Sequence, residues 1–384
     1  MNDVKSVAIV FANLKGNIGD FAIFDAMLRS ISNAYPDHTI DVYPHAFLNV
    51  DEQRLSAFLA EGEIDFEIVG ETFYFPTPEI LKRFFRFGFW PYIQRYLVFQ
   101  SAKKSYAHAE RFSDYDAIFI AGGDHWNGMK LGISMFGTLR AIASHNKNIF
   151  AYPFSLNPAV QTYNKKNDLR RYFSLIRQPL IVRDSTSQDF LAGLGIETVL
   201  GHDTVFELSR IAKNIVGLPN RDSGRVLLVL AKGDDRKIRQ TSMHRLIEDL
   251  QSSGHTVELL STCELEDKEI FESEARHFGI TARAPITWQE TVAELRQSSI
   301  VVTNRLHCLI LGTFAECTLF PVADREKSKA FVRDTQLSHY ANCVDEISNE
   351  ALEAAIHDRD QIAGLMRAYR EASAECATSP IIDR

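Results

Sequence analysis

The stretch SIVVTNRLHCLILGTFAECTLFPV, residues 299–322, contains a complete strand–helix–strand pattern. A short apolar run, Ser299–Asn304, is followed by a longer apolar segment and then by a second short run, Thr318–Val322. Short apolar runs on either side of a helical segment predict two strands joined by a helix. Arg305 and His307 lie between the first strand and the helix, where their polarity contrasts with the apolar residues around them.

Similar apolar runs recur along the whole chain and alternate with helical patterns such as Asp20–Asn33 and Leu131–His145. This alternation predicts parallel sheets with helices on both faces, so the expected fold class is α/β. The other expected strands are Val4–Ala12, Thr39–Tyr43, Asp65–Val69, Tyr115–Gly122, Asn148–Pro153 and Leu180–Asp184 in the first half, and Arg225–Ala231 and His255–Ser261 in the second.

The polar stretch 214–224 separates the two series of strands and is expected to be a linker. We therefore predict an N-terminal α/β domain over residues 1–213, a C-terminal α/β domain over 225–335, and C-terminal helices over 336–384. A chain of 384 residues suits two such domains. The expected architecture is two doubly wound, Rossmann-like domains that face each other across a cleft. Ligands bind beyond the carboxyl ends of parallel strands, so the site is expected in the turns that follow them.

The composition is typical of a soluble globular protein, with 45% hydrophobic and 24% charged residues. A net charge of -8 gives no overall basic field, which excludes general attraction to nucleic acid. The five cysteines form no CxxC pair, so neither a disulfide scaffold nor a zinc ribbon is indicated. The apolar run near the N-terminus is too short for a signal peptide or a membrane span. These features favour a cytoplasmic protein.

Residues 81–104, LKRFFRFGFWPYIQRYLVFQSAKK, are dense in aromatic side chains with Lys and Arg between them. Such a mixture suits a membrane–water interface or a lipid-bearing substrate. Aromatic-rich helices are more often part of a core, and packing into the N-terminal domain is the alternative interpretation. The segment therefore allows peripheral contact with the inner face of a membrane without requiring it.

The turn after the first strand reads NLKGNIGD, residues 13–20. Asp20 is placed to cap the following helix, and Gly19 allows close approach of the backbone. With Asn17, these residues form a helix start whose free N–H groups attract an anion or a sugar hydroxyl. The spacing is not GxGxxG, so no dinucleotide site is predicted.

A second polar turn, GGDHW, is expected at the end of the strand Tyr115–Gly122. The residues are Gly122, Gly123, Asp124, His125 and Trp126. An aromatic ring stacks on a sugar face, while a carboxylate and an imidazole bind or deprotonate hydroxyl groups. We therefore interpret this turn as a site of sugar recognition.

In the second half, Lys232 and Arg236 follow the first expected strand, and Arg305 and His307 occupy the start of the helix in residues 299–322. Arginine gives bidentate contact to phosphate or carboxylate, and the start of a helix adds its dipole. His307 could hold a phosphate or transfer a proton near neutral pH. These cations predict an anionic substrate.

For other polar residues at strand ends, a structural role and a functional role are equally plausible. Arg183 and Asp184 follow a strand directly, where a structural ion pair is as plausible as a role in binding. The motif HDTVF, residues 202–206, could shape the cleft or merely cap an edge strand.

Together these motifs resemble the polysaccharide pyruvyltransferase family. The resemblance is carried, in the expected order over roughly residues 5–335, by GNIGD (Gly16–Asp20), AGGD (Ala121–Asp124), VRDSTSQDFLAGLGI (Val182–Ile196), HDTVF (His202–Phe206), TNRLHCLILGTFAECTLFPV (Thr303–Val322) and DREKSKAF (Asp324–Phe331). It implies a GT-B-like fold and transfer of pyruvate from phosphoenolpyruvate onto a sugar of a polysaccharide or its lipid-linked precursor, usually as a ketal.

By the same resemblance, Arg305 and His307 are expected in the donor site on the C-terminal side, with Lys327 in a nearby lysine-bearing turn. The GNIGD and GGD residues are expected to bind the acceptor. The family often has a third glycine where this chain has Asp124, so either Asp124 or Asp20 could be the base for the acceptor hydroxyl. Phosphoenolpyruvate would be a co-substrate, and no cofactor or metal is expected, because no residues show ligand spacing.

Two alternatives remain open at this point. A GT-B glycosyltransferase with a nucleotide-sugar donor would need a carboxylate for the ribose hydroxyls, and Glu316 fits that description. The second alternative is a glycan-binding protein without catalytic activity, whose cleft would lack a group of converging cationic side chains.

Overall fold

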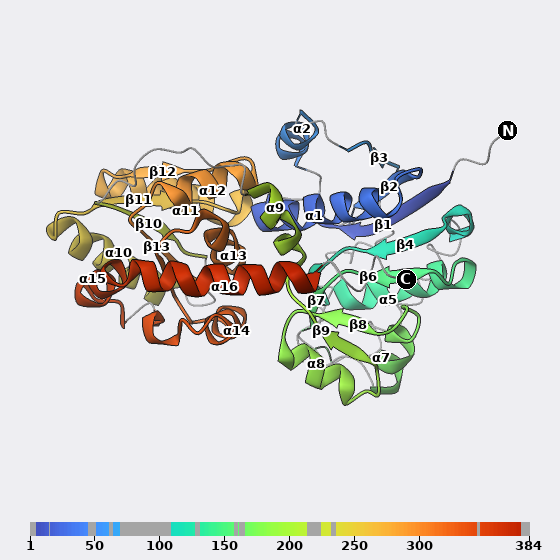
Figure 1. Ribbon diagram of the computed structural model, residues 1–384. Coiled ribbons are helices and arrows are strands. Elements are labelled where there is room, and N and C mark those ends of the chain that lie inside the picture. Colours follow the sequence, from blue (N-terminus) through green and yellow to red (C-terminus); the bar gives the residue numbers. More distant parts are fainter. Residues whose placement is uncertain are drawn as a thin grey trace, which may run out of the picture.

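The computed structural model describes residues 5–14, 16–44, 51–60, 64–69, 109–126, 131–156, 160, 166–212, 224–231, 236–343 and 346–377. It forms two α/β lobes that lie side by side (Figure 1). The first lobe comprises the elements from β1 to α9, and the second lobe those from β10 to α15. Two α/β units with parallel sheets were predicted, and the structure confirms them.

The central sheet of the first lobe is entirely parallel, with strand order β3-β2-β1-β4-β6. A second sheet, with order β5-β7-β8-β9, continues it, because β5 follows β4 after two residues and β7 likewise follows β6. The strands are β1 (Ser6–Ala12), β2 (Thr39–Pro44), β3 (Glu67–Ile68), β4 (Ala117–Ile120), β5 (Gly123–Trp126), β6 (Ile149–Ala151), β7 (Phe154–Leu156), β8 (Leu180–Val182) and β9 (Thr198–Leu200).

The predicted turn GGDHW is wrong in position, because Gly123–Trp126 form β5. Two adjacent glycines read as a turn signal, but here they only bend the chain between two strands. Gly123 has a φ of 113°, which favours glycine, and its N–H still donates to Pro153 O at 3.2 Å. The strand therefore continues into the second sheet instead of ending before a helix.

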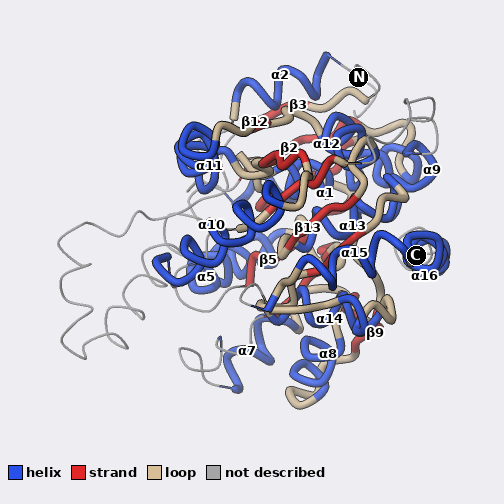
Figure 2. The backbone as a smooth tube through the Cα atoms, turned by 90° about the vertical axis from the view of Figure 1, so that its left-hand side faces the viewer, coloured by secondary structure: helices blue, strands red, loops and turns tan. Residues whose placement is uncertain are grey.

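The helices of the first lobe surround these sheets, with α2 at the top and α7 and α8 at the bottom of Figure 2. The predicted cap of α1 is wrong by three residues, because Asn17 is the N-cap and Asp20 lies within the first turn. The helix is buried on nearly all sides, through residues such as Phe21, Phe24 and Leu28. The helical segments are α1 (Ile18–Ala34), α2 (Glu52–Ala60), η2 (Ala109–Asp114), α5 (Leu131–His145), α7 (Lys166–Phe173), α8 (Ser185–Ala192), η3 (Thr204–Leu208) and α9 (Ser209–Ala212).

The second lobe contains one parallel sheet with strand order β12-β11-β10-β13-β14. Its strands are β10 (Arg225–Val229), β11 (Thr256–Leu260), β12 (Thr281–Arg283), β13 (Ile300–Thr303) and β14 (Leu319–Pro321). Its helical segments are α10 (Arg236–Ser252), α11 (Glu264–Phe278), α12 (Trp288–Arg296), α13 (Leu306–Ala315), α14 (Glu326–Asp334), η4 (Ser338–Tyr340) and α15 (Asn349–His357). β10 is the central strand. β11 and β12 follow it on one side, and β13 and β14 lie on the other side, as in a Rossmann sheet.

The stretch 299–322 folds as the sequence predicts, into β13, α13 and β14. Most of α13 is buried, and Gly312 lets it approach the sheet closely, since a Cβ there would lie 2.7 Å from Leu319 Cδ2. The apolar part of the helix is thus core, and its first turn is the part left at the edge of the sheet.

The last helix, α16 (Arg359–Ala377), joins the two lobes. It runs along the second lobe and reaches the first, as Figure 1 shows. There Ser373 Oγ lies 3.1 Å from His202 Nδ1, and Tyr369 packs edge-on against Phe206. One buried hydrophobic cluster accordingly extends from the first sheet through α1 to the second lobe.

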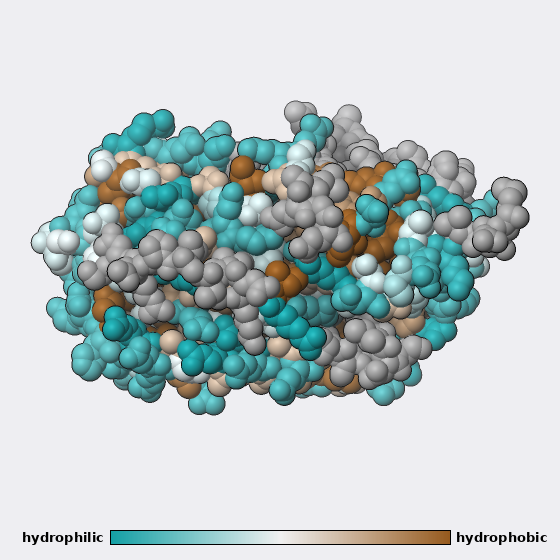
Figure 3. Space-filling model, turned by 45° about the horizontal axis from the view of Figure 1, so that its top comes forward, coloured by the Kyte–Doolittle hydropathy of each residue, from teal (hydrophilic) through white to brown (hydrophobic). Residues whose placement is uncertain are grey.

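The surface in Figure 3 is mostly hydrophilic, with hydrophobic residues gathered mainly on the first lobe. Within the described ranges, no helix combines the length and the hydropathy needed to cross a membrane. The aromatic segment 81–104 lies outside the described residues, as does the predicted linker apart from Gly224.

Candidate active site

Each central sheet has one topological switch point, where the helices that follow two neighbouring strands lie on opposite faces of the sheet. It lies between β1 and β4 in the first lobe and between β10 and β13 in the second. In open parallel sheets, the carboxyl ends of the strands at this point form the ligand site. The segments that follow β1 and β13 are GNIGD and RLH, so the fold places both motifs where a ligand is expected.

The GNIGD segment starts α1 and docks on the second lobe. Gly16 has a φ of 55°, which a residue with a side chain adopts only with strain. Asn17 then caps α1 by accepting a hydrogen bond from Gly19 N at 3.0 Å. Ile18 N donates to Thr262 O at 3.0 Å, and Asn17 forms an antiparallel bridge with Cys263, immediately before α11. The starts of α1 and α11 therefore lie against each other.

Asp20 borders a small hollow at the switch point of the first lobe. Its Oδ2 accepts a hydrogen bond from Asn13 Nδ2 at 2.5 Å. The hollow has room for about one water molecule and is lined by Ala12, Asn13, Asp20, Ile23, Phe24, Met27, Ala121 and Gly122. It combines an amide and a carboxylate with an apolar wall, which is the combination that sugar sites use.

Arg305 occupies the N-cap position of α13, where its side chain makes no capping hydrogen bond to the described residues, and its guanidinium pairs with Asp267 on α11. The residue before it is braced, because Asn304 Oδ1 accepts from Ala231 N at 2.7 Å and so ties β13 to the end of β10. Thr303 Oγ1 donates to Val229 O at 2.7 Å and adds a second tie between these strands. The backbone that presents Arg305 is consequently rigid.

His307 lies on the first turn of α13 and packs against the first turn of α1. A Cβ on Gly19 would lie 1.9 Å from His307 Nδ1, so only glycine leaves room for the ring. The His307 side chain is 21% exposed, and its Nε2 is buried without a hydrogen-bond partner among the described residues. The nearest charged group is Asp203, whose Oδ2 lies 3.7 Å from Nε2. The imidazole of the second lobe is thus enclosed by two residues of the first.

Asp203 is buried, pairs with Arg183 and lies 3.7 Å from His307 Nε2. Arg183 Nη1 donates to Asp203 Oδ2, while Asp203 Oδ1 accepts from Val205 N at 3.1 Å and caps η3. Burial would raise the pKa of Asp203, but Arg183 and His307 outweigh it and hold the pKa well below its usual range. The carboxylate therefore stays charged beside His307.

The open question about Arg183 and Asp184 is answered by these contacts. Arg183 pairs with Asp203, and Asp184 instead caps α8 by accepting from Ser187 N at 2.8 Å. HDTVF likewise belongs to the site, since Asp203 faces His307.

The remaining predicted residues lie at various distances from this centre. Gly122 borders the hollow, and its N–H points to Met27 Sδ at 3.4 Å. Lys327 is half-buried on the first turn of α14. Lys232 lies outside the described residues, and so do the side chains of Arg236, Asp124, His125 and Trp126. The described part of the chain contains no group of three or more His, Cys, Asp or Glu residues arranged to hold a metal ion.

Glu316 lies at the opposite end of α13 from His307. It ends the helix with a φ of 50° and pairs with Arg367 at 3.2 Å and Arg370 at 3.1 Å. Burial would raise the pKa of Glu316, but the two arginines of α16 lower it. The carboxylate is committed to packing α16, which removes the feature that favoured a nucleotide-sugar donor.

Sequence reasoning did not assign roles to Asp203, Arg183 and Asp267. Asp203 lies beside His307, Asp267 pairs with Arg305, and Arg183 holds Asp203. Two of them stood in motifs that had been singled out, Arg183 in VRDS and Asp203 in HDTVF. The sequence did contain a usable pattern for these two residues. Arg183 follows a short apolar strand, and Asp203 comes just before an apolar segment. Asp267 lies in a helix rich in Glu and Lys and gave no such signal.

Two facing Rossmann-like lobes with polar residues at the carboxyl ends of both sheets define a GT-B-like protein, and known structures agree. The UDP-GlcNAc 2-epimerase of Neisseria meningitidis bound to UDP-GlcNAc has a TM-score of 0.62 at 11% identity, over 98% of each chain. A putative UDP-N-acetylglucosamine 2-epimerase of Listeria monocytogenes has a TM-score of 0.61 at 11% identity, covering 97% of this chain and 94% of its own. Anabaena Alr3699/HepE in complex with UDP and glucose has 0.52 at 10% identity, covering 97% and 95%. These likenesses establish the fold.

The family follows from the sequence itself. The model of the polysaccharide pyruvyl transferase family matches residues 17–323, which is most of the chain. No curated protein sequence matches significantly. The chain belongs to the polysaccharide pyruvyl transferase family and is a transferase, as the resemblance of its motifs predicted.

Proposed function

We propose that this transferase moves pyruvate from phosphoenolpyruvate onto a sugar of a polysaccharide or of its lipid-linked precursor and forms a ketal. The observation that carries the proposal is the meeting of three helix starts around His307 and Arg305. The start of α1 touches the start of α11 through Ile18 N and Thr262 O, and touches the start of α13 through Gly19 and His307.

Helix starts carry partial positive charge, so their meeting favours an anion. Phosphoenolpyruvate has a phosphate and a carboxylate, and both need cationic or N–H partners. The guanidinium of Arg305 has five N–H donors, so it can serve a donor oxygen while it still pairs with Asp267. Membership in the transferase family and this anionic preference support phosphoenolpyruvate as the donor.

The proposed reaction balances without a cofactor. A proton adds to the methylene carbon of phosphoenolpyruvate, and a sugar hydroxyl attacks the adjacent carbon. Phosphate leaves with its bonding electrons, and a second hydroxyl of the same sugar then closes the ketal ring. His307 is our choice for the acid, and Arg305 neutralises charge on the departing phosphate.

The acceptor is proposed to bind on the side of the first lobe. Asn13 and Asp20 border the narrow hollow there and are the proposed partners of an acceptor hydroxyl. Asp20 is then the base for the acceptor hydroxyl. A lipid-linked acceptor would bring the protein to the inner face of a membrane, and the segment 81–104 is the proposed contact.

The test is release of inorganic phosphate from phosphoenolpyruvate in the presence of candidate glycans. We expect phosphate release that depends on the glycan, together with a product heavier by the mass of a bound pyruvate. The variant His307→Gln should lower kcat by about 10²- to 10⁴-fold. The matched control is His244→Gln, because His244 pairs with Glu274 at 2.6 Å on the outer side of the second lobe. Turnover of a UDP-sugar without phosphate release in any glycan mixture would refute the proposal.

A further inference from the structure

His307 belongs to the second lobe, yet the charged group nearest to its buried Nε2 is a carboxylate of the first lobe, at 3.7 Å. We propose that Asp203 is a positioning residue that fixes the orientation and the tautomer of His307. The inference rests on the proposed function and deepens it, because it says which nitrogen of the ring serves the donor.

Asp203 is itself held too firmly to follow the imidazole. Its Oδ1 is bound to Val205 N at the start of η3, and its Oδ2 accepts from Arg183. Arg183 is fixed in turn, because its Nε lies 3.2 Å from Ser155 Oγ, next to β7 and β8. The side chains of Arg183 and Asp203 are 5% and 4% exposed. A carboxylate anchored in this way orients its neighbour instead of being oriented by it.

The geometry divides the two nitrogens of His307 between two tasks. Nε2 faces Asp203, so the tautomer with its proton on Nε2 is favoured by the charge of the carboxylate. The Nδ1 side of the ring packs against the backbone of Gly19 in the first turn of α1, in the space that a side chain would fill. That is the helix start at which an anionic donor is expected. Nδ1 is therefore the nitrogen that gives or takes the proton.

The same contact makes the site depend on both lobes. Gly19 and Asp203 come from the first lobe, while His307 and the helix that carries it come from the second. The imidazole reaches this environment only when the two lobes are together. A carboxylate that orients an imidazole in this manner stabilises the imidazolium without accepting its proton.

The plain alternative is a structural ion pair, in which Arg183 and Asp203 merely close the first lobe and the nearness of His307 has no consequence. The two interpretations differ in what happens to the ring when the carboxylate loses its charge. A structural pair predicts no change in His307, whereas a positioning residue predicts a ring that is no longer fixed.

The first test needs no substrate. The full-length protein is labelled with ¹⁵N-histidine, and the variant His307→Gln identifies the ring signals of His307. At alkaline pH, where the ring is neutral, we expect the wild type to show a single tautomer with the proton on Nε2. In Asp203→Asn we expect averaged signals of two tautomers. Unchanged His307 signals in a folded Asp203→Asn variant would overturn the inference.

The matched control is Asp184→Asn, since Asp184 also caps a helix shortly after a strand, and its carboxylate accepts hydrogen bonds from Ser187 of that helix. It should leave the His307 signals unchanged. Asp203→Asn leaves Arg183 buried without a charged partner and could prevent folding. The double variant Arg183→Met/Asp203→Asn removes both charges and should fold, and it should show the same averaged signals. Fixed signals in this double variant would equally overturn the inference.

The second test measures phosphate release. Asp203→Asn should lower kcat about 100-fold with little change in KM for phosphoenolpyruvate, because the ring remains present but is wrongly held. Equal kcat in Asp203→Asn and wild type would count against positioning. If the ring signals change as expected but the wild type releases no phosphate with any glycan, the proposed function falls and the contact between Asp203 and His307 stands.

Discussion

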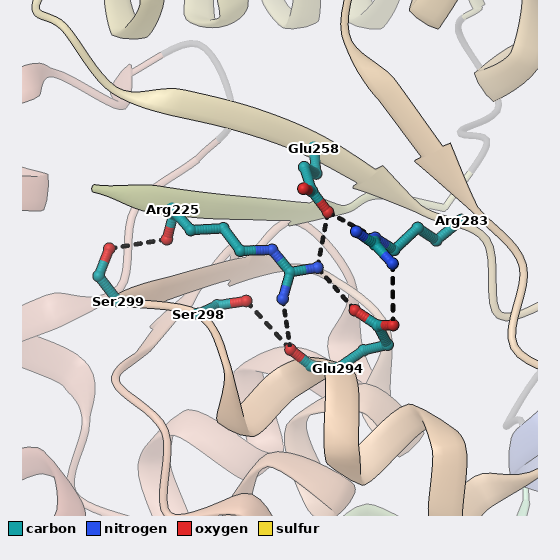
Figure 4. A network of polar contacts seen from close by, with 6 residues as sticks. All are labelled: Arg225, Glu258, Arg283, Glu294, Ser298 and Ser299. Atoms are coloured by element: carbon teal, nitrogen blue, oxygen red, sulfur yellow. Dashed lines mark hydrogen bonds and ion pairs between the residues drawn. The ribbon is translucent and has the colours of Figure 1, made fainter. Parts of the chain in front are cut away.

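The second lobe contains a balanced network, in which arginines and carboxylates are equal in number. The site between the lobes contains an unbalanced group, in which one carboxylate has both an arginine and a histidine beside it. The balanced network consists of Arg225, Glu258, Arg283 and Glu294 (Figure 4). Arg225 Nη2 lies 2.6 Å from both Glu258 Oε2 and Glu294 Oε2, and Arg283 bridges the same two carboxylates at 2.7 and 3.3 Å. Burial would raise the pKa of Glu258, but the two arginines lower it. Two cations thus face two carboxylates.

In the unbalanced group, the single carboxylate of Asp203 lies between the guanidinium of Arg183 and the imidazole of His307. The two groups also lie at opposite ends of their sheets. Arg225 is the first residue of β10, whereas the site lies beyond the carboxyl ends of the strands, about 16 Å along a five-residue strand. Arginine–carboxylate pairs thus occur at both ends of the sheets, and at the carboxyl end a histidine joins such a pair.

Breaking the balanced network should give the largest loss of stability. In Glu258→Gln the buried Arg225 keeps only one carboxylate, and we expect the free energy of unfolding to fall by about 3–5 kcal/mol. The measurement is urea unfolding, with kcat determined below the transition. Because the network lies away from the strand carboxyl ends, kcat should not change.

The matched control for Glu258→Gln is Asp249→Asn. Asp249 pairs with Arg245 at 3.6 Å, and the two side chains are 49% and 74% exposed. An exposed pair of this kind contributes about 0–1 kcal/mol. A loss of kcat in Glu258→Gln would contradict the separation between the two groups.

Gly19→Ala tests the unbalanced group by moving its imidazole. The new Cβ would lie 1.9 Å from His307 Nδ1, so the ring must leave its position or the lobes must separate. We expect kcat to fall about 100-fold, within the range that general acid–base catalysis contributes. The measurement is phosphate release together with the ring signals of His307.

Gly364→Ala on α16 is the control for this substitution. It meets no atom within 4 Å, and alanine in a helix should raise the free energy of unfolding by up to about 1 kcal/mol. Full activity in Gly19→Ala would show that the ring does not need its place beside α1.

A carboxyl group that burial keeps protonated, that of Glu207, should make stability depend on pH. Glu207 is largely buried on η3, and burial raises its pKa to about 8. The folded state therefore holds a proton that the unfolded chain releases near its ordinary pKa of 4.5. Stability should be highest below that value and fall as pH rises toward 8, by about 2–3 kcal/mol between pH 5 and 7.

Glu207→Gln removes this titration and should unfold with nearly the same free energy at both pH values, apart from other groups. Urea unfolding of the variant and the wild type at each pH checks the difference. An equal decline in both would contradict the assignment to Glu207. The balanced network, by contrast, should lose stability in acid, because the depressed pKa of Glu258 makes its contribution present at neutral pH and lost as the pH falls through that pKa.

The strands and most helices could be predicted because short apolar runs between turn residues report local structure directly. The same logic located His307 and Arg305, since a polar residue after a buried strand must lie at the edge of the sheet. It failed at Gly122 and Gly123, where a turn signal lies inside a bent strand. A local pattern cannot show that the chain continues into a second sheet.

The partners within the site could not be predicted, because they depend on how the lobes meet. Asp203 is 104 residues before His307 in sequence, and Gly19 is 288 residues before it. The spacing of the motifs contains no information about which of them touch. The glycine of GNIGD illustrates this, since its sequence context indicates backbone approach to a ligand, and the structure adds that it makes room for an imidazole.

Glu316→Gln should have the smallest effect. It tests whether the donor binds at the end of α13 that carries His307 or at the end that carries Glu316. The helix has ten residues and is about 15 Å long, so Glu316 is remote from His307. Its partners Arg367 and Arg370 belong to α16, and we expect only a slight loss of stability and no change in kcat or in KM for phosphoenolpyruvate. A glycosyltransferase that used Glu316 for ribose hydroxyls would instead bind UDP, and the variant would lose that binding. Calorimetry with UDP on both proteins therefore decides which end of this helix faces the donor.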